Sequence, residues 1–158
     1  MIIIGIDPGI AITGYGIVKK TKNDLKCSNY GVIKTSPLLT PEQRLKKLHL
    51  ELFKLLKKYQ PRVLAVENVY FFKNLKTAIP VSEAKGVILL TAAKKQIKVE
   101  QLTPLQVKMT ICGYGRATKK QIQKMVKEIL NLNKIPKPDD AADALAIAIC
   151  CGVEKRRT

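Results

Sequence analysis

Five acidic residues stand where a carboxylate is unusual in a sequence that has only 12 Asp and Glu. Asp7 and Glu67 each end a short apolar run, and Asp139, Asp140 and Asp143 open an alanine-rich segment. Carboxylates near a protein interior need a cation or hydrogen-bond donors beside them. A turn-capping role for Asp7 is the simpler alternative to a functional one.

The chemistry open to these acids is that of hard metal ions. Carboxylate oxygens without His or Cys partners suit Mg²⁺ or Mn²⁺. Two such ions roughly 3.5–4 Å apart can activate a water and stabilise the leaving oxygen in phosphodiester cleavage. If the fold gathers the acids, they predict a metal-dependent nuclease.

The three acids near residue 140 fall at the expected start of a helix. Asp140 and Asp143 are spaced i, i+3, and Asp139 and Asp143 are spaced i, i+4, so either pair projects from one helix face. Acids also stabilise a helix N-terminus through its dipole, so capping explains one or two of them. Spacing alone leaves Asp139 and Asp140 open as the partner of Asp143. The alanines that follow allow this helix to approach a sheet edge closely.

Alternating strand and helix patterns predict an α/β fold with a five-stranded mixed sheet flanked by helices. Strands are expected at residues 2–6, 11–18, 25–33, 62–67 and 97–102, and helices at 41–59, 80–96, 104–112, from 119 and from 139. The helix before residue 62 implies a right-handed crossover, which places this strand parallel to the first. Asp7 and Glu67 then emerge at one sheet edge, where open α/β sheets bind ligands.

Length and charge limit the class of protein. The 158 residues suit a single domain, expected over 1–153 with a short basic tail at 154–158. A formal net charge of +17 favours a polyanionic partner, with nucleic acid ahead of an anionic membrane. No apolar run approaches the ~20 residues of a membrane span, and the N-terminus lacks a basic n-region, so a cytoplasmic location is expected.

Histidine and cysteine chemistry is not indicated. The four cysteines show no C-x-x-C spacing, and they are interpreted as reduced core residues. His49, the only histidine, stands among Lys46, Lys47 and Glu51 and is interpreted as part of a solvated helix face.

Two segments have the composition of nucleic-acid contacts. Residues 68–76, directly after Glu67, combine aromatic and basic side chains that suit unstacked bases, namely Tyr70, Phe71, Phe72, Lys73 and Lys76. Anchoring of the loop to the core is the alternative for Phe71 and Phe72.

The second segment is a glycine-rich loop at residues 113–121 that enters a helix. Backbone N–H groups, the helix dipole, Arg116, Lys119 and Lys120 converge there and suit a phosphate, and Lys108 on the preceding helix can join them. Plain solvated surface is the alternative for these lysines. The loop lacks the spacing of a Walker motif.

Three motifs in order resemble a known family. They are Gly5-Ile6-Asp7-Pro8-Gly9 with Thr13-Gly14-Tyr15-Gly16, then Val66-Glu67-Asn68-Val69-Tyr70, then Asp140-Ala141-Ala142-Asp143-Ala144-Leu145-Ala146. Together they are similar to RuvC-type Holliday-junction resolvases, and the resemblance covers essentially the whole chain.

The resemblance implies a ribonuclease H-like fold, a homodimer, two divalent metals per site, and symmetric nicks in four-way DNA junctions during recombination and repair. It implies that Asp7, Glu67, Asp140 and Asp143 are the catalytic acids. It also favours Tyr70, where members often have Phe, as the residue stacking on junction bases, and Lys108 and Lys119 as DNA contacts. A branch-migration helicase is the implied protein partner.

Two other classes of protein remain open. An actin-like or sugar-kinase ATPase domain also begins with an Asp-x-Gly strand, but it normally needs a second such domain. A non-catalytic junction-binding module leaves Glu67 and Asp143 without a role. The helix segment at residues 87–93 is apolar on nearly all sides, so it is expected to be buried on two of them. One side can cover the sheet, and the other can lie against a neighbouring helix or an identical subunit, of which the subunit is favoured as the candidate interface.

Overall fold

The computed structural model describes residues 1–22, 24–68 and 75–154. Within them the chain forms β1 (Ile2–Asp7), β2 (Ile12–Lys20), β3 (Leu25–Lys34), α1 (Pro41–Tyr59), β4 (Val63–Glu67), α2 (Leu75–Lys94), β5 (Lys98–Leu102), α3 (Pro104–Cys112), α4 (Lys119–Ile129) and α5 (Asp139–Glu154). The five-stranded mixed sheet flanked by helices is as the sequence predicts.

The strands form one sheet in the order β3-β2-β1-β4-β5. β2 is antiparallel to both of its neighbours, whereas β1, β4 and β5 run parallel to one another. Both parallel connections include a helix, α1 before β4 and α2 before β5, because parallel strands need a crossover. The carboxyl ends of β1, β4 and β5 therefore meet at one edge of the sheet.

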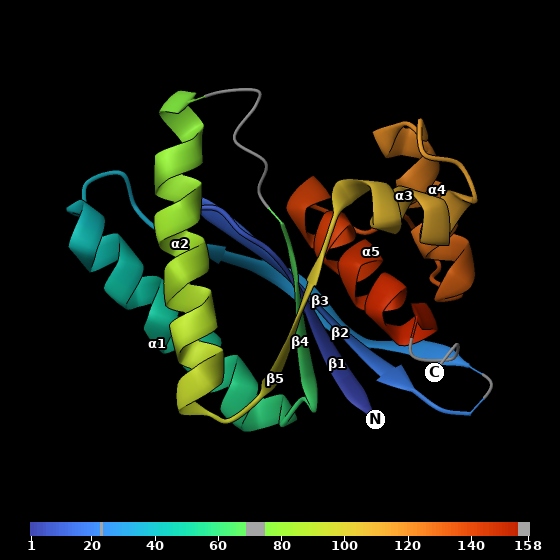
Figure 1. The fold of residues 1–158 in the computed structure, drawn as a ribbon, viewed down its shortest axis with the longest axis horizontal. Coiled ribbons are helices and arrows are strands. Elements are labelled where there is room, and N and C mark those ends of the chain that lie inside the picture. Colours follow the sequence, from blue (N-terminus) through green and yellow to red (C-terminus); the bar gives the residue numbers. More distant parts are fainter. Residues whose placement is uncertain (23, 69–74, 155–158) are drawn as a thin grey trace.

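Helices cover both faces of the sheet (Figure 1). α1 and α2 lie on one face, where Leu48, Leu52 and Leu56 of α1 pack with Ile4 and Ile6 of β1. α5 lies on the other face, flanked by α3 and α4. Burial on both sides explains why β1 is apolar at every position except its glycine and its terminal acid.

Threonine caps set the start of the helices that border the site. At α3 the Gln106 N–H donates to Thr103 Oγ1 (3.1 Å), and the Thr103 N–H donates to Gln106 Oε1 (2.8 Å). Thr118 and Gln121 form the same reciprocal pair at α4. Each pair satisfies N–H groups that a helix start leaves unpaired, as the Thr-x-x-Gln spacing predicts.

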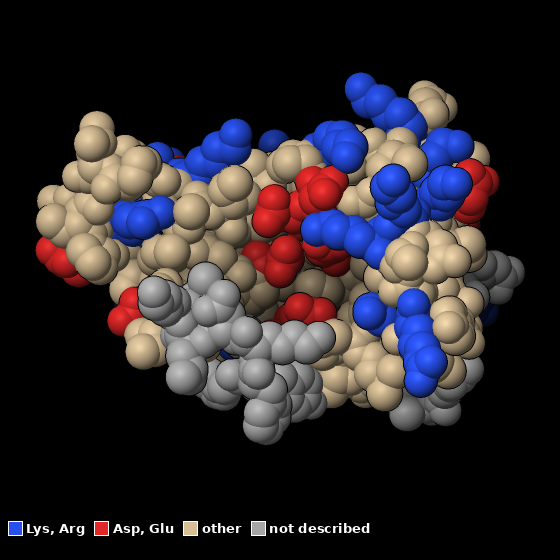
Figure 2. Space-filling model, turned by 90° about the horizontal axis from the view of Figure 1, so that it is seen from above, with Lys and Arg blue, Asp and Glu red and all other residues tan. Residues whose placement is uncertain are grey.

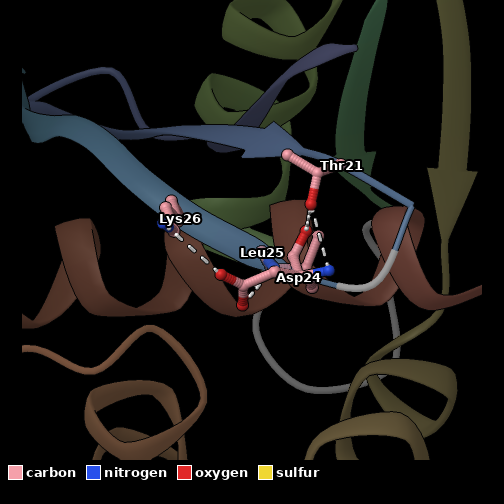
Figure 3. A network of polar contacts seen from close by, with 4 residues as sticks. All are labelled: Thr21, Asp24, Leu25 and Lys26. Carbon is pink, nitrogen blue, oxygen red and sulfur yellow. Dashed lines mark hydrogen bonds and ion pairs between the residues drawn. The ribbon is translucent and has the colours of Figure 1, made fainter.

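Figure 3 shows the polar contacts of the turn that joins β2 to β3. The turn lies at the end of the sheet away from Asp7, because Asp7 pairs with Gly14 and Ile2 pairs with Lys19. The Asp24 N–H donates to Thr21 Oγ1 (3.2 Å), and the Leu25 N–H donates to Asp24 Oδ1 (2.9 Å). Asp24 also forms an exposed ion pair with Lys26 at 3.8 Å.

Two expectations about helices are wrong. α2 begins at Leu75, so Pro80 stands inside the helix and not at its first position. A proline there removes one backbone hydrogen bond, a loss that packing of a 20-residue helix offsets. His49 is not on a solvated face, because α2 covers that side of α1: its Nδ1 lies 2.7 Å from Thr91 Oγ1 and its ring contacts Phe53.

α2 is only partly covered. Ala84, Ile88 and Ala92 are fully buried against α1 and the sheet, whereas Ile79 and Leu90 are 65% and 58% exposed. The composition of α2 predicts a helix that is buried on two sides. Within the described chain, only the side that faces α1 and the sheet is buried. No described helix is both long enough and apolar enough to cross a membrane.

Candidate active site

Three elements bring the acids to one place. β1 and β4 pair in parallel with Ile6 opposite Val66, so the next residues, Asp7 and Glu67, lie side by side where the two strands end. α5 begins above the same edge and carries Asp140 and Asp143 in its first turns. The sequence predicts this convergence, and the structure has it.

Glycines in the sheet allow α5 to come this close. A Cβ atom on Gly5 of β1 would overlap the Ala144 carbonyl oxygen, and one on Gly14 of β2 would overlap the Asp140 carbonyl oxygen. Helix backbone therefore rests directly on strand backbone, and the alanines of α5 complete the contact. The close contact thus depends on glycines in the sheet and alanines in α5, and the sequence indicated only the role of the alanines.

The acids line a cavity of about 220 Å³. Asp7, Glu67, Asp143, Lys108 and Lys119 are its charged lining residues, and apolar side chains of α3, α4 and α5 form the rest of its wall. Figure 2 shows the acids gathered in a central hollow, with basic side chains over α3 and α4 beside them. The arrangement suits a polyanion that approaches the acids from the basic side.

Burial and mutual repulsion perturb the acids strongly. Burial raises the pKa of Asp7 to about 7, helped by the negative charges of Asp143, Glu67 and Asp140. The pKa of Glu67 is also raised, first by burial and then by Asp143, against Lys108 and Lys85. Burial raises the pKa of Asp143 against the opposing effect of Lys119. Such crowding is relieved when cations bind between the carboxylates.

Asp139 and Asp140 differ in what surrounds them. Asp140 is one of the charges that raise the pKa of Asp7. Asp139 instead accepts a hydrogen bond from Lys137 Nζ (3.0 Å) and lies 3.8 Å from Lys119 Nζ, and its pKa is lowered. The environment favours Asp140 as the companion of Asp7, Glu67 and Asp143, a choice that spacing left open.

Lys119 now provides the positive charge at this cluster. Its ammonium lies 2.9 Å from Asp143 Oδ2, and this contact raises the lysine pKa. Among the described residues, no three acids are already arranged around a single ion position. The donor set nevertheless fits a hard divalent cation, because it consists of carboxylates alone and their charge is poorly compensated.

The other predicted basic contacts lie on the same side. Lys108 lines the cavity from α3, and Lys119 and Lys120 begin α4. Arg116, in the loop between these helices, is exposed. Tyr70, Phe71, Phe72 and Lys73, together with the side chain of Lys76, lie outside the described residues.

Sequence reasoning missed Lys85 and Asn68. Lys85 Nζ donates to Asn68 Oδ1 (2.8 Å), and its charge opposes the rise in the pKa of Glu67. Lys85 follows Ser82 and Glu83 in the sequence, so its local context gave no signal that it lies near the site. Lys85 and Lys108 therefore both act on Glu67 as positive charges.

The crowding of the acids predicts a stability effect. Asp7 has a pKa near 7 in the folded protein and about 3.8 in the unfolded chain, so its ionisation destabilises the fold as pH rises toward 8. We expect Asp7→Asn to stabilise the metal-free protein at pH 8 by on the order of 2–4 kcal/mol, a Tm increase of roughly 5–10 °C. Thermal unfolding in EDTA measures it.

The difference should shrink as pH falls toward 5, because Asp7 is then protonated in the folded parent. Asp24→Asn, at an exposed acid in the β2–β3 turn, is the matched control and should leave Tm nearly unchanged. An Asp7→Asn protein that melts below the parent at pH 8 would show that the carboxylate is not strained.

The known proteins that are similar to this chain share one description. Residues 3–151 match the family model described as crossover junction endodeoxyribonuclease RuvC. Relatives of that name include one from Halothermothrix orenii, 51% identical and covering 96% of this chain and 92% of its own. Another, from Thermosipho melanesiensis, is 52% identical and covers 99% of both chains.

Solved structures give the same result. The Thermus thermophilus RuvC structure has a TM-score of 0.90 at 33% identity, covering 100% of this chain and 98% of that one. T. thermophilus RuvC in complex with a Holliday junction substrate has a TM-score of 0.90 at 31% identity, covering 99% and 96%. The predicted ribonuclease H-like fold is confirmed. By sequence and by fold, this chain belongs to the RuvC family of crossover junction endodeoxyribonucleases.

Proposed function

We propose that this protein resolves four-way DNA junctions by paired, symmetric nicks in recombination and repair. The observation that carries the proposal is the cluster of Asp7, Glu67 and Asp143 in one cavity beside basic helices. A RuvC from T. thermophilus has been seen with a Holliday junction substrate. Cutting of a synthetic four-way junction, compared with a linear duplex of the same sequence, tests it.

The proposed catalytic residues are Asp7, Glu67, Asp140 and Asp143, which would together hold two Mg²⁺ ions, with Mn²⁺ as a substitute. When bound, the metals supply an activated water and charge stabilisation at the leaving oxygen, giving 5′-phosphate and 3′-hydroxyl ends. The fold would hold the four carboxylates in position, because Asp7 and Glu67 end β1 and β4 and the two others lie in the first turns of α5. Lys85 and Lys108 oppose the rise in the pKa of Glu67 and so favour the ionised form that a metal ligand needs.

The basic side chains would bind the DNA backbone. Lys108 and Lys119 line the cavity from α3 and α4, Lys120 follows Lys119 in α4, and Arg116 lies in the loop between the two helices. From the sequence, Tyr70 would stack on unpaired junction bases, with Phe71, Phe72, Lys73 and Lys76 beside it. The basic tail predicted at residues 154–158 would add a contact beyond the single nuclease domain at residues 1–153.

A homodimer fits the substrate, because one site makes one nick and a two-fold junction needs two. On α2, the exposed residues Ile79, Glu83, Gly86, Leu90 and Ala93 recur at spacings of four and three. This stripe overlaps the interface expected at residues 87–93. Gly86 has open space beyond its Cα within the chain, so a partner helix can approach closely there.

Leu90→Asp should therefore convert the dimer to a monomer, because it places a charge in the middle of an apolar helix contact. Sedimentation velocity at micromolar concentration measures the change. Leu105→Asp, at an equally exposed leucine on α3, is the control and should leave the dimer intact. A Leu90→Asp protein that sediments like its parent would place the interface elsewhere.

A branch-migration helicase remains the proposed protein partner. The ATPase and the non-catalytic alternatives are not favoured, because the match to an endonuclease family spans residues 3–151. Four acids in a metal-ligand set are also without purpose in a module that only binds DNA.

A further inference from the structure

A second cavity, larger than the one at the acids, lies on the opposite face of the sheet. It has a volume of about 470 Å³ and runs between α1 and the edge strand β3. Lys34, Lys47, Lys54 and Lys58 line it together with Tyr15 and Glu51. We call it the α1–β3 groove. The resolvase site makes no use of it, because the acids open on the α5 side.

The charge of the α1–β3 groove is strongly positive. Its four lysines face a single acid, Glu51, which forms an ion pair with Lys54 at 2.7 Å. Within the described part of the chain, Lys34, Lys47 and Lys58 have no carboxylate within ion-pair distance. Three uncompensated ammonium groups around one hollow favour an anionic occupant.

The spacing of the lysines indicates a linear occupant. Lys47, Lys54 and Lys58 are separated by two turns and one turn of α1, so they share one helix face. From the first to the last, the helix rises roughly 16 Å. One strand of a DNA duplex presents about five phosphates over that length. A small anion such as a nucleotide would use only part of such a row.

The groove begins close to the active-site edge. Asp7 pairs with Gly14 of β2, and Gly14 pairs with Val32 of β3, which lines the groove. Neighbouring strands are about 4.8 Å apart, so the Val32 backbone lies roughly 10 Å from that of Asp7. Figure 2 shows basic side chains along the upper rim of the face that holds the acids, as well as over α3 and α4.

From this continuity we infer that the α1–β3 groove holds the phosphate backbone of a junction arm as it leaves the active site over the β2–β3 side of the sheet. This rests on the proposed function. The groove carries no sequence readout, because its lysines reach phosphates and not base edges. It extends the DNA contact from the cut site to the arm and so favours a long-armed junction.

The test removes the groove lysines and the arm phosphates separately and together, and it measures the salt dependence of junction binding in each case. The variant is Lys47→Gln/Lys58→Gln, and its matched control is Lys46→Gln/Lys57→Gln, two exposed lysines of the same helix outside the groove. Each is titrated in EDTA with a four-way junction, and with one carrying neutral methylphosphonate linkages at about the third to eighth position of every arm, counted from the crossover.

On the natural junction, the groove variant should reduce the slope of log affinity against log salt by about 1.8, or 0.9 for each lost contact. On the neutral-linkage junction its slope should match the parent's within about 0.5, because those phosphates are already absent. The control should show the same small change with both junctions.

Two results would overturn the inference. One is an equal reduction by both variants, which would be an effect of net charge alone. The other is an equal reduction on both junctions, which would place the contact elsewhere or assign the groove to a different acidic partner. A parent protein that binds linear duplex as tightly as a junction would contradict the proposed function itself, a separate outcome.

Discussion

Replacing Asp7 with Asn, Glu67 with Gln or Asp143 with Asn should each reduce junction cleavage by roughly 10³-fold or more. Each change keeps the size of the side chain and removes the negative charge that a divalent cation requires. Junction affinity should be kept or slightly raised, because a charge that repels phosphate is lost. Single-turnover cleavage and equilibrium binding, measured on the same preparation, separate the two effects.

The control for this set is Asp24→Asn, which removes one charge from an exposed turn far from the cavity. It should cut at the parental rate. A site variant that cleaves within about threefold of the parent would remove that residue from the catalytic set. A variant that loses binding and cleavage together would instead indicate a role in the shape of the site.

Asp140→Asn and Asp139→Asn should differ by roughly 10²-fold in cleavage, although the residues are adjacent. Asp140 contributes to the repulsion at Asp7, whereas Asp139 is paired with Lys137 and is not among the charges that raise the pKa of Asp7. Asp139→Asn should therefore cleave within about threefold of the parent and lose only the small stabilisation that a negative charge gives to a helix N-terminus.

The magnesium response gives a second measurement of the same pair. Mg²⁺ should raise the Tm of the Asp139→Asn protein as much as that of the parent, because a ligand that binds only the folded state stabilises it. The Asp140→Asn protein should respond less. The reverse order in both measurements would assign the site to Asp139.

The strand ends could be predicted from the sequence, and so could the edge at which they meet. Short apolar runs that stop at Asp7 and Glu67, with a helix between them, leave few topologies other than two parallel strands. The start of α5 was also evident, because acids followed by alanines form a capped helix that can pack closely. Local sequence patterns were sufficient to predict these elements, because each strand end and helix start depends on residues that are close in sequence.

What the sequence did not show depends on contacts between distant elements. The position of His49 required knowing that α2 covers α1. Spacing alone left Asp139 and Asp140 open, and the different surroundings of the two acids appear only when Asp7 and Lys137 are in place. The roles of Gly5 and Gly14 appear only when α5 lies on them. The α1–β3 groove arises from lysines on a helix and a strand edge that look like ordinary solvated residues in the sequence.

Cleavage of a synthetic four-way junction with and without Mg²⁺ tests the central claim most directly. We expect paired nicks at symmetric positions in opposing strands when Mg²⁺ or Mn²⁺ is present, little cutting of a linear duplex, and none in EDTA. Junction cutting that persists in EDTA, or equal cutting of junction and duplex with Mg²⁺, would contradict the account of these acids as a metal-dependent junction resolvase.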